Sequence, residues 1–198
     1  SIRCGEPVFG LCAIGFVHPG RVWRKAGARA GDIVVLSKPL GTGVLVSSRR
    51  PEAARTAVES MRTTNRRAAA ALRAAGRAPS AVTDVSGFGL VGHASEIAAL
   101  SGVELTIDAG RVPLLAGARE IARAGVRTSA HRREARGLGA DVRFAGVSDE
   151  LQVLLRDPQT SGGLLAAVAP DDVARLADAG FVPIGEVRAG PPAVVVTG

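Results

Sequence analysis

The sequence contains no tyrosine, and phenylalanine and tryptophan together supply only 3% of its 198 residues. A buried core must therefore be built from alanine, valine, leucine and isoleucine. Hydrophobic residues make up 46% of the chain, a share typical of globular proteins. The same shortage of aromatic rings leaves few platforms on which nucleic-acid bases could stack. We expect a globular chain with an aliphatic core.

Lysine is also scarce, because only Lys25 and Lys38 among the 25 basic residues are not arginine. The net charge of +7 attracts nucleic acids or phosphorylated ligands. The arginines, however, are spread along the chain and form no basic stripe of the kind that follows a nucleic-acid backbone. We expect no nucleic-acid partner.

Cysteine and long apolar runs are lacking too. Cys4 and Cys12 are too few for a disulfide framework and do not have CxxC spacing, which favours a reduced, cytoplasmic protein. No apolar run approaches the roughly 18 residues of a membrane span, and no charged segment precedes an apolar one as in a signal peptide. We expect a cytoplasmic location and no membrane partner.

Short apolar runs bounded by glycine and proline alternate with helical patterns along the chain. We expect strands at 9–17, 32–37, 81–85, 103–107, 164–168, 181–187 and 193–196, and helices at 51–75 (one or two), 91–100, 114–123, 149–155 and 171–179. The polar stretch 21–31 is typical of a linker. This mixture predicts an α+β fold, a mixed sheet with covering helices. The arginines of the 51–75 segment are expected to form a solvated face.

Three loop segments carry the residues from which chemistry could be built. KPLGTG, Lys38 to Gly43, combines glycines at a helix start with a lysine, which favours either nearby phosphate or simply a tight strand-to-helix turn. DPQTSGGLL, Asp157 to Leu165, exposes polar groups before a glycine pair and indicates a polar ligand or an interdomain contact. Ser161 in it has no identifiable base, which argues against a serine hydrolase.

The third segment is TDVSGFGLVGH, Thr83 to His93, in which Asp84 ends an apolar strand before a glycine-rich loop. Mg²⁺ is commonly held by one or two carboxylates together with phosphate oxygens and water. Asp84 is therefore the candidate metal ligand. His93, three residues before Glu96, is expected to make a structural hydrogen bond with it, since a lone histidine is rarely catalytic.

In this order the segments resemble the selenophosphate synthetase (selenide, water dikinase) family, within the aminoimidazole-ribonucleotide-synthetase-like superfamily. The resemblance runs from SIRCGEPVFGL through LSKPLGTGVL, TDVSGFGLVGH and DPQTSGGLL to GFVPIGEV. It implies a two-domain, homodimeric enzyme that uses Mg²⁺ and makes selenophosphate, AMP and orthophosphate from selenide, ATP and water. Asp84 matches a metal-binding aspartate of the family, and Ser1 matches the last residue of a Gly-His-Ser segment that touches ATP.

The resemblance also divides the chain. Residues 1–25 correspond to the end of an N-terminal ATP-binding domain, with its last strand, and a linker, and residues 26–198 to the C-terminal synthetase-like domain. The family's nucleophile, a cysteine or selenocysteine, and its lysine match no residue here, so the 198 residues alone are expected to be inactive. Cys4 lies off the nucleophile motif and has no adjacent base, so we interpret it as an ordinary strand-edge residue.

Two departures from the family pattern affect these expectations. Arg3 stands where the family usually has an acidic residue, and RTSAHRRE, at 127–134, replaces a Pro-Gly-Gly loop.

Two other interpretations stay open. One is another ATP-using member of the superfamily, such as an aminoimidazole ribonucleotide synthetase or a hydrogenase-maturation protein, against which DPQTSGGLL argues; the other is a non-catalytic domain that binds a nucleotide or a partner protein.

Overall fold

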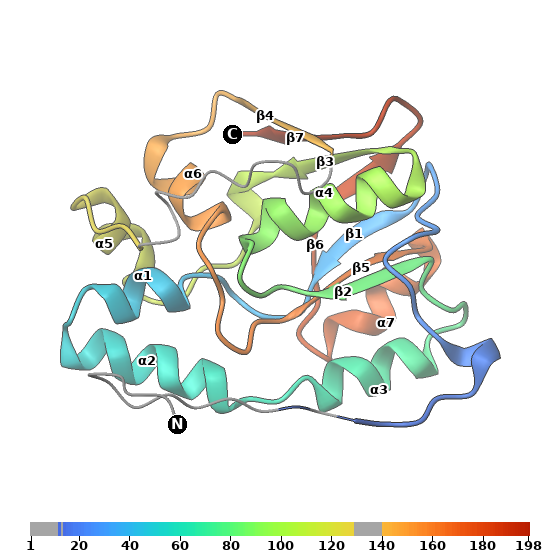
Figure 1. Ribbon diagram of the computed structural model, residues 1–198, viewed down its shortest axis with the longest axis horizontal. Helices are drawn as coiled ribbons and strands as arrows, with labels where there is room; N and C mark the ends of the chain where they lie inside the picture. Colours follow the sequence, from blue (N-terminus) through green and yellow to red (C-terminus); the bar gives the residue numbers. More distant parts are fainter. Residues whose placement is uncertain (1–11, 13, 129–139) are drawn as a thin grey trace, which may run out of the picture.

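A single mixed sheet organises the chain (Figure 1). The computed structural model describes Cys12, residues 14–128 and residues 140–198. The sheet has the strand order β2-β5-β1-β6-β3-β7-β4. Its pairs are antiparallel except β3 with β7 and β4 with β7, which are parallel. The strands are β1 Ile33–Leu36, β2 Ala81–Asp84, β3 Glu104–Asp108, β4 Asp141–Ala145, β5 Leu164–Val168, β6 Val182–Arg188 and β7 Ala193–Thr197.

Helices cover both faces of this sheet. On one face α4 and α6 pack on side chains such as Val34 and Leu36. On the other face α3 and α7 pack on Val35 and its neighbours, as expected from the alternation of side chains along a strand. A smaller apolar cluster joins α1, α2, α5 and α6. The helices are α1 Thr42–Ser47, α2 Pro51–Arg62, α3 Arg66–Ala74, α4 Gly89–Ser101, α5 Ala118–Arg123, α6 Asp149–Leu155 and α7 Val173–Ala177.

The predicted α+β architecture and its aliphatic core are confirmed. The largest fully buried side chains of the described residues are leucine and isoleucine. Phe181 is the buried residue among the phenylalanines and tryptophan of the described part. Figure 1 shows α2 and α3 following one another, so the 51–75 segment forms two helices. The predicted solvated face is also confirmed, because its arginines are all exposed: Arg55, Arg62, Arg66, Arg67 and Arg73.

Two expectations about elements need correction, and one strand was not expected. Cys12 and Ile14 to His18, the described part of the predicted 9–17 strand and its end, are not in a strand, and a strand needs a neighbour to pair its backbone groups. The helix expected from residue 114 begins only at Ala118, because Leu114 makes an isolated bridge with Leu40. The strand β4 was not predicted at all.

The described part of the chain has no helix long and apolar enough to cross a bilayer.

The α4 helix, the longest, ends as predicted at Gly102, which adopts a left-handed conformation (φ 69°) and donates its N–H to the carbonyl of Ala98 (2.9 Å). This cap is typical of glycine just past a helix. Most of α4 is buried, from Gly89 to Ala98 apart from Glu96, while its last turn carries an exposed leucine, Leu100.

Replacing Ile97 on the buried face of α4 is expected to be costly. The side chain is 1% exposed, so Ile97→Ala leaves a cavity, and the free energy of unfolding should fall by about 2–5 kcal/mol. Leu100→Ala on the same helix is the matched control, since Leu100 is 60% exposed, and should change stability by less than about 0.5 kcal/mol. Denaturant unfolding measures both; equal losses would contradict the assigned packing of α4.

Candidate functional site

Asp84 lies where β2 ends and the glycine-rich loop to α4 begins. The residue is exposed, and its backbone pairs with Leu164 at the start of β5. No group of three or more histidine, cysteine, aspartate or glutamate residues that could hold a metal occurs within residues 14–128 and 140–198. A single accessible carboxylate is compatible with Mg²⁺, which commonly takes its other ligands from phosphates and water. That Asp84 binds a metal stays a prediction.

The loop after Asp84 is held by a buried histidine. His93 is 4% exposed; its Nε2 lies 3.1 Å from the hydroxyl of Ser86 and its Nδ1 lies 2.8 Å from Oε2 of Glu96. The same Glu96 oxygen accepts a hydrogen bond from Nζ of Lys25 at 2.7 Å. Burial acts to raise the pKa of Glu96, but these two donors bring the pKa below its ordinary value. The predicted hydrogen bond between His93 and Glu96 is confirmed.

Gln159 joins the DPQTSGGLL loop to the start of α1. Its side chain is buried, and Oε1 accepts hydrogen bonds from the backbone N–H of Gly41 (3.1 Å) and Thr42 (3.2 Å) and from the Thr42 hydroxyl (3.1 Å). The Nε2 group donates to the carbonyl and to Oδ2 of Asp157. Together these contacts satisfy N–H groups that a helix start leaves unpaired. The loop is thus a structural clamp on α1.

The clamp favours the second interpretation of KPLGTG, a tight strand-to-helix turn. The N–H groups of Gly41 and Thr42 bond to Gln159, and that of Gly43 bonds to the Asp157 carboxylate at 2.9 Å. Because protein oxygens occupy these donors, the glycines serve a tight strand-to-helix turn. An anion could reach the same N–H groups only by displacing buried hydrogen bonds.

Lys38 is buried behind this turn, with 7% of the residue exposed. Its Nζ donates to the carbonyls of Ser161 (2.7 Å) and Ser60 (3.3 Å), and burial lowers the pKa of its ammonium group. Lys38 thereby ties the DPQTSGGLL loop to α2. It also lines an open pocket of about 280 Å³ together with residues at the start of α3 and after α7.

The glycine pair of DPQTSGGLL permits close contact between loops. A Cβ atom at Gly162 would lie 2.1 Å from the carbonyl oxygen of Val85, so any other residue would force the two loops apart. Ser161 has a left-handed backbone (φ 54°) and donates its hydroxyl to the carbonyl of Met61 at 2.8 Å. No histidine or carboxylate contacts this hydroxyl in the described structure, which agrees with the argument against a serine hydrolase.

Several other residues singled out in the sequence lie outside the described part of the chain. Ser1, Arg3 and Cys4 lie outside the described residues, as does most of the RTSAHRRE segment. Within that segment Arg127 is described, and it donates to the carbonyl of Ala122 at 2.8 Å. The possible ATP contact of Ser1 therefore stays a prediction.

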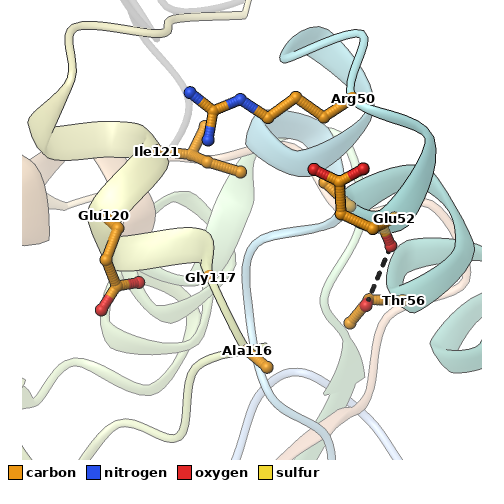
Figure 2. Close-up of a pocket in the computed structure, with 8 residues that line it drawn as sticks. Arg50, Glu52, Thr56, Ala116, Gly117, Glu120 and Ile121 are labelled. Atoms are coloured by element: carbon orange, nitrogen blue, oxygen red, sulfur yellow. Dashed lines mark hydrogen bonds between the residues drawn. The ribbon is translucent and has the colours of Figure 1, made fainter.

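A separate pocket lies between the start of α2 and the segment leading into α5 (Figure 2). It has a volume of about 180 Å³, and Thr56 donates its hydroxyl to the carbonyl of Glu52 at its wall. None of the three motif segments contributes to its lining, so it is not part of the candidate site. The lining residues are Arg50, Glu52, Ala53, Thr56, Ala116, Gly117, Glu120 and Ile121.

The structural roles of Gln159 and Asp157 were not predicted from the sequence, and the expectation that the segment exposes its polar groups is wrong for Gln159, which is buried. Asp157 is fully buried, and burial raises the pKa of its carboxyl to about 6, although N–H groups of Val44, Gln159 and Gly43 oppose this by donating to it. Its Oδ1 has no hydrogen-bond partner among the described residues. A buried carboxyl of this kind destabilises the fold when it ionises.

This burial predicts a stability difference that depends on pH. Folded Asp157 keeps its proton up to about pH 6, whereas the ordinary value is 3.8, so between these values the folded state holds more protons and its stability falls as the pH rises. At about 1.4 kcal/mol per pKa unit, the loss is about 2–3 kcal/mol. In Asp157→Asn the side-chain amide oxygen can take the place of Oδ2 and accept the same hydrogen bonds. Because an amide does not ionise, this variant should not lose stability in this way as the pH rises.

The measurement is the free energy of unfolding of both proteins from pH 4 to pH 8. The parent should lose stability relative to Asp157→Asn between about pH 4 and 6, with a constant difference above about pH 7. A difference that is constant over the whole range would contradict a carboxyl with a raised pKa.

Comparison with known proteins identifies the family. Residues 29–197 match the family described as AIR synthase related protein, C-terminal domain. Selenide, water dikinase of Burkholderia pseudomallei is 44% identical over 209 residues, which cover 100% of this chain and 59% of that relative. Selenide, water dikinase 2 of Peptoclostridium acidaminophilum is 39% identical over 178 residues, covering 87% of this chain and 51% of the relative. The chain thus spans 51–59% of the length of these two relatives.

Solved structures support the same fold. The hydrogenase maturation protein HypE of E. coli has a TM-score of 0.61 at 19% identity, over 88% of this chain and 49% of that chain. Thiamine-monophosphate kinase of Stenotrophomonas maltophilia has a TM-score of 0.54 at 22% identity, over 90% of this chain and 54% of that chain. At such identities the likeness shows the fold alone. With the match over residues 29–197, the chain belongs to the AIR synthase related family and contains its C-terminal domain.

Proposed function

We propose that the chain is part of an ATP-dependent enzyme that makes selenophosphate, AMP and orthophosphate from selenide, ATP and water. The observation that carries this proposal is the similarity over 100% of the chain to a protein named selenide, water dikinase. Relatives with that name are longer than this chain, so the reaction is proposed for a protein of their full length. Such a protein is expected to be a cytoplasmic homodimer.

In this proposal Asp84 supplies one carboxylate oxygen to Mg²⁺ at the end of β2. Mg²⁺, when bound, neutralises charge on the phosphate oxygens of ATP. The exposure of Asp84 leaves its carboxylate accessible to a nucleotide held by other parts of the enzyme. The neighbouring clamp around Gln159 keeps the loops beside Asp84 in place, which lowers the cost of ordering them on binding. Ser1 is proposed as a contact to ATP.

ATP as a ligand is also in keeping with two solved structures of the same fold. HypE has been solved in complex with ATP, and thiamine monophosphate kinase of Aquifex aeolicus has been solved with AMPPCP and TMP. Both are below 25% identical to this chain. The likeness is therefore no argument that this chain takes part in the reactions of those two proteins. The 198 residues alone are proposed to lack the nucleophile of the reaction and to be inactive.

Asp84→Asn tests the metal role in a protein of the relatives' full length. The substitution keeps size and polarity but removes the charge that attracts Mg²⁺, so selenide-dependent AMP formation should slow at least about tenfold, equivalent to about 1.4 kcal/mol in the barrier. Excess Mg²⁺ should restore part of the rate if metal affinity is the cause.

The matched control is Asp108→Asn, at the end of β3. Its carboxylate accepts a hydrogen bond from the N–H of Gly110 at 2.9 Å, so it is a strand-end aspartate with a turn-capping role, and its replacement should leave the magnesium dependence unchanged.

The 198-residue chain alone should form no AMP. An Asp84→Asn enzyme with the parent's rate and magnesium dependence would remove Asp84 from the site.

A further inference from the structure

Four polar side chains form a continuous path from the segment before β1 to the loop after Asp84. Lys25 Nζ lies 2.7 Å from Glu96 Oε2, the same oxygen lies 2.8 Å from His93 Nδ1, and His93 Nε2 lies 3.1 Å from the Ser86 hydroxyl. The path becomes more buried from Lys25 to His93, since the side chain of Lys25 is 38% exposed, that of Glu96 20% and that of His93 5%.

The chemistry of the groups gives this path a direction. An ionised Glu96 can only accept hydrogen bonds, so Nδ1 of His93 carries a hydrogen; when the ring has no second hydrogen, Nε2 accepts that of the Ser86 hydroxyl. Glu96 therefore fixes the tautomer of His93, and the histidine fixes the side chain of Ser86. Lys25 in turn holds the shared oxygen of Glu96.

Ser86 is the point where the two motif loops meet. Its carbonyl accepts hydrogen bonds from the N–H of Gly89 (3.1 Å), which closes the turn after Asp84, and from the N–H of Gln159 (2.9 Å) in the clamp on α1. The ring of Phe88 packs against His93, with 5.5 Å between the ring centres. A shift of Ser86 would therefore disturb both the turn after Asp84 and the loop that contains Gln159.

The other end of the path lies just outside the family's C-terminal domain, because the match to that domain begins at Arg29. Here the chain is docked on the domain through its backbone. The carbonyl of Arg24 accepts a hydrogen bond from the N–H of Val82 in β2 (2.8 Å), and the N–H groups of Gly27 and Ala28 bond to the hydroxyl of Ser101 at the end of α4 (3.0 and 3.1 Å).

We propose that Lys25, Glu96, His93 and Ser86 are positioning residues that couple the segment before β1 to the loop following Asp84. When Lys25 is docked on Glu96, the path holds the Ser86 turn, and with it the end of β2, in one arrangement. The coupling itself is a property of this chain. Its consequence for Mg²⁺ rests on the proposed function of Asp84.

The first test is amide hydrogen exchange in the 198-residue chain, which needs no activity. Lys25→Met removes the charge but keeps the apolar stem. A partly exposed ion pair contributes little energy, so exchange at the N–H groups of Gly89 and Gln159 should accelerate by only about threefold. The exchange of the β3 amides should stay unchanged, because the opening is local. Lys25→Arg should restore the slow exchange. His93→Gln should accelerate the same amides by about tenfold or more.

The matched control is Arg24→Met, which removes a positive charge from the adjacent residue. The side chain of Arg24 is exposed, and its replacement should leave the exchange of Gly89 and Gln159 as in the parent. Equal exchange at these amides in Lys25→Met and Arg24→Met would overturn the coupling, as would an acceleration spread evenly over β3.

The second test is the magnesium dependence of AMP formation in a protein of the relatives' full length. Lys25→Met should raise the Mg²⁺ concentration for half-maximal rate by about threefold, in proportion to the change in exchange. In an Asp84→Asn background the same substitution should have no further effect. If Asp84→Asn alone leaves the magnesium dependence unchanged, the metal proposal fails, while the exchange experiment still decides the coupling.

Discussion

The buried side-chain amide of Gln159 connects two segments that are 117 residues apart in the chain. Its oxygen pairs N–H groups at the start of α1, and its nitrogen holds Asp157. Without it, buried donors would remain unpaired, at a cost of about 1–3 kcal/mol each. The turn after β1, the close approach of Gly162 to Val85 and the burial of Lys38 all depend on the loop that this amide fixes.

This arrangement divides the motifs between support and chemistry. KPLGTG and DPQTSGGLL use their polar groups on each other, and TDVSGFGLVGH uses Ser86 and His93 to hold its own turn. Asp84 is different, because it is exposed at the end of β2. Within the described motif segments, Asp84 is therefore an accessible carboxylate on a preorganised frame. Such a frame suits a metal ligand, since groups held in place before binding do not have to be ordered by it.

Much of the fold could be predicted because the local signals were strong: α6 and β5 have the predicted bounds, and Gly102 caps α4. The polar alternation of β4 was overlooked, although Val142 and Phe144 are the more buried residues of that strand. Asp84 could be proposed from its position after an apolar run. The role of Gln159 could not, because its partners at Gly41 and Thr42 are distant in sequence and no local pattern encodes them.

A double-mutant cycle between Gln159 and Thr42 tests most directly whether the two loops act as one unit. Gln159→Met and Thr42→Val each remove the contact at 3.1 Å, and the free energies of unfolding of both single variants and the double variant give the coupling energy. A coupling of about 1 kcal/mol or more is expected for side chains in one buried network. Gln152, which bonds instead to the carbonyl of Val147, supplies the control, and Gln152→Met with Thr42→Val should be additive. Additivity of Gln159→Met and Thr42→Val within about 0.3 kcal/mol would contradict the account.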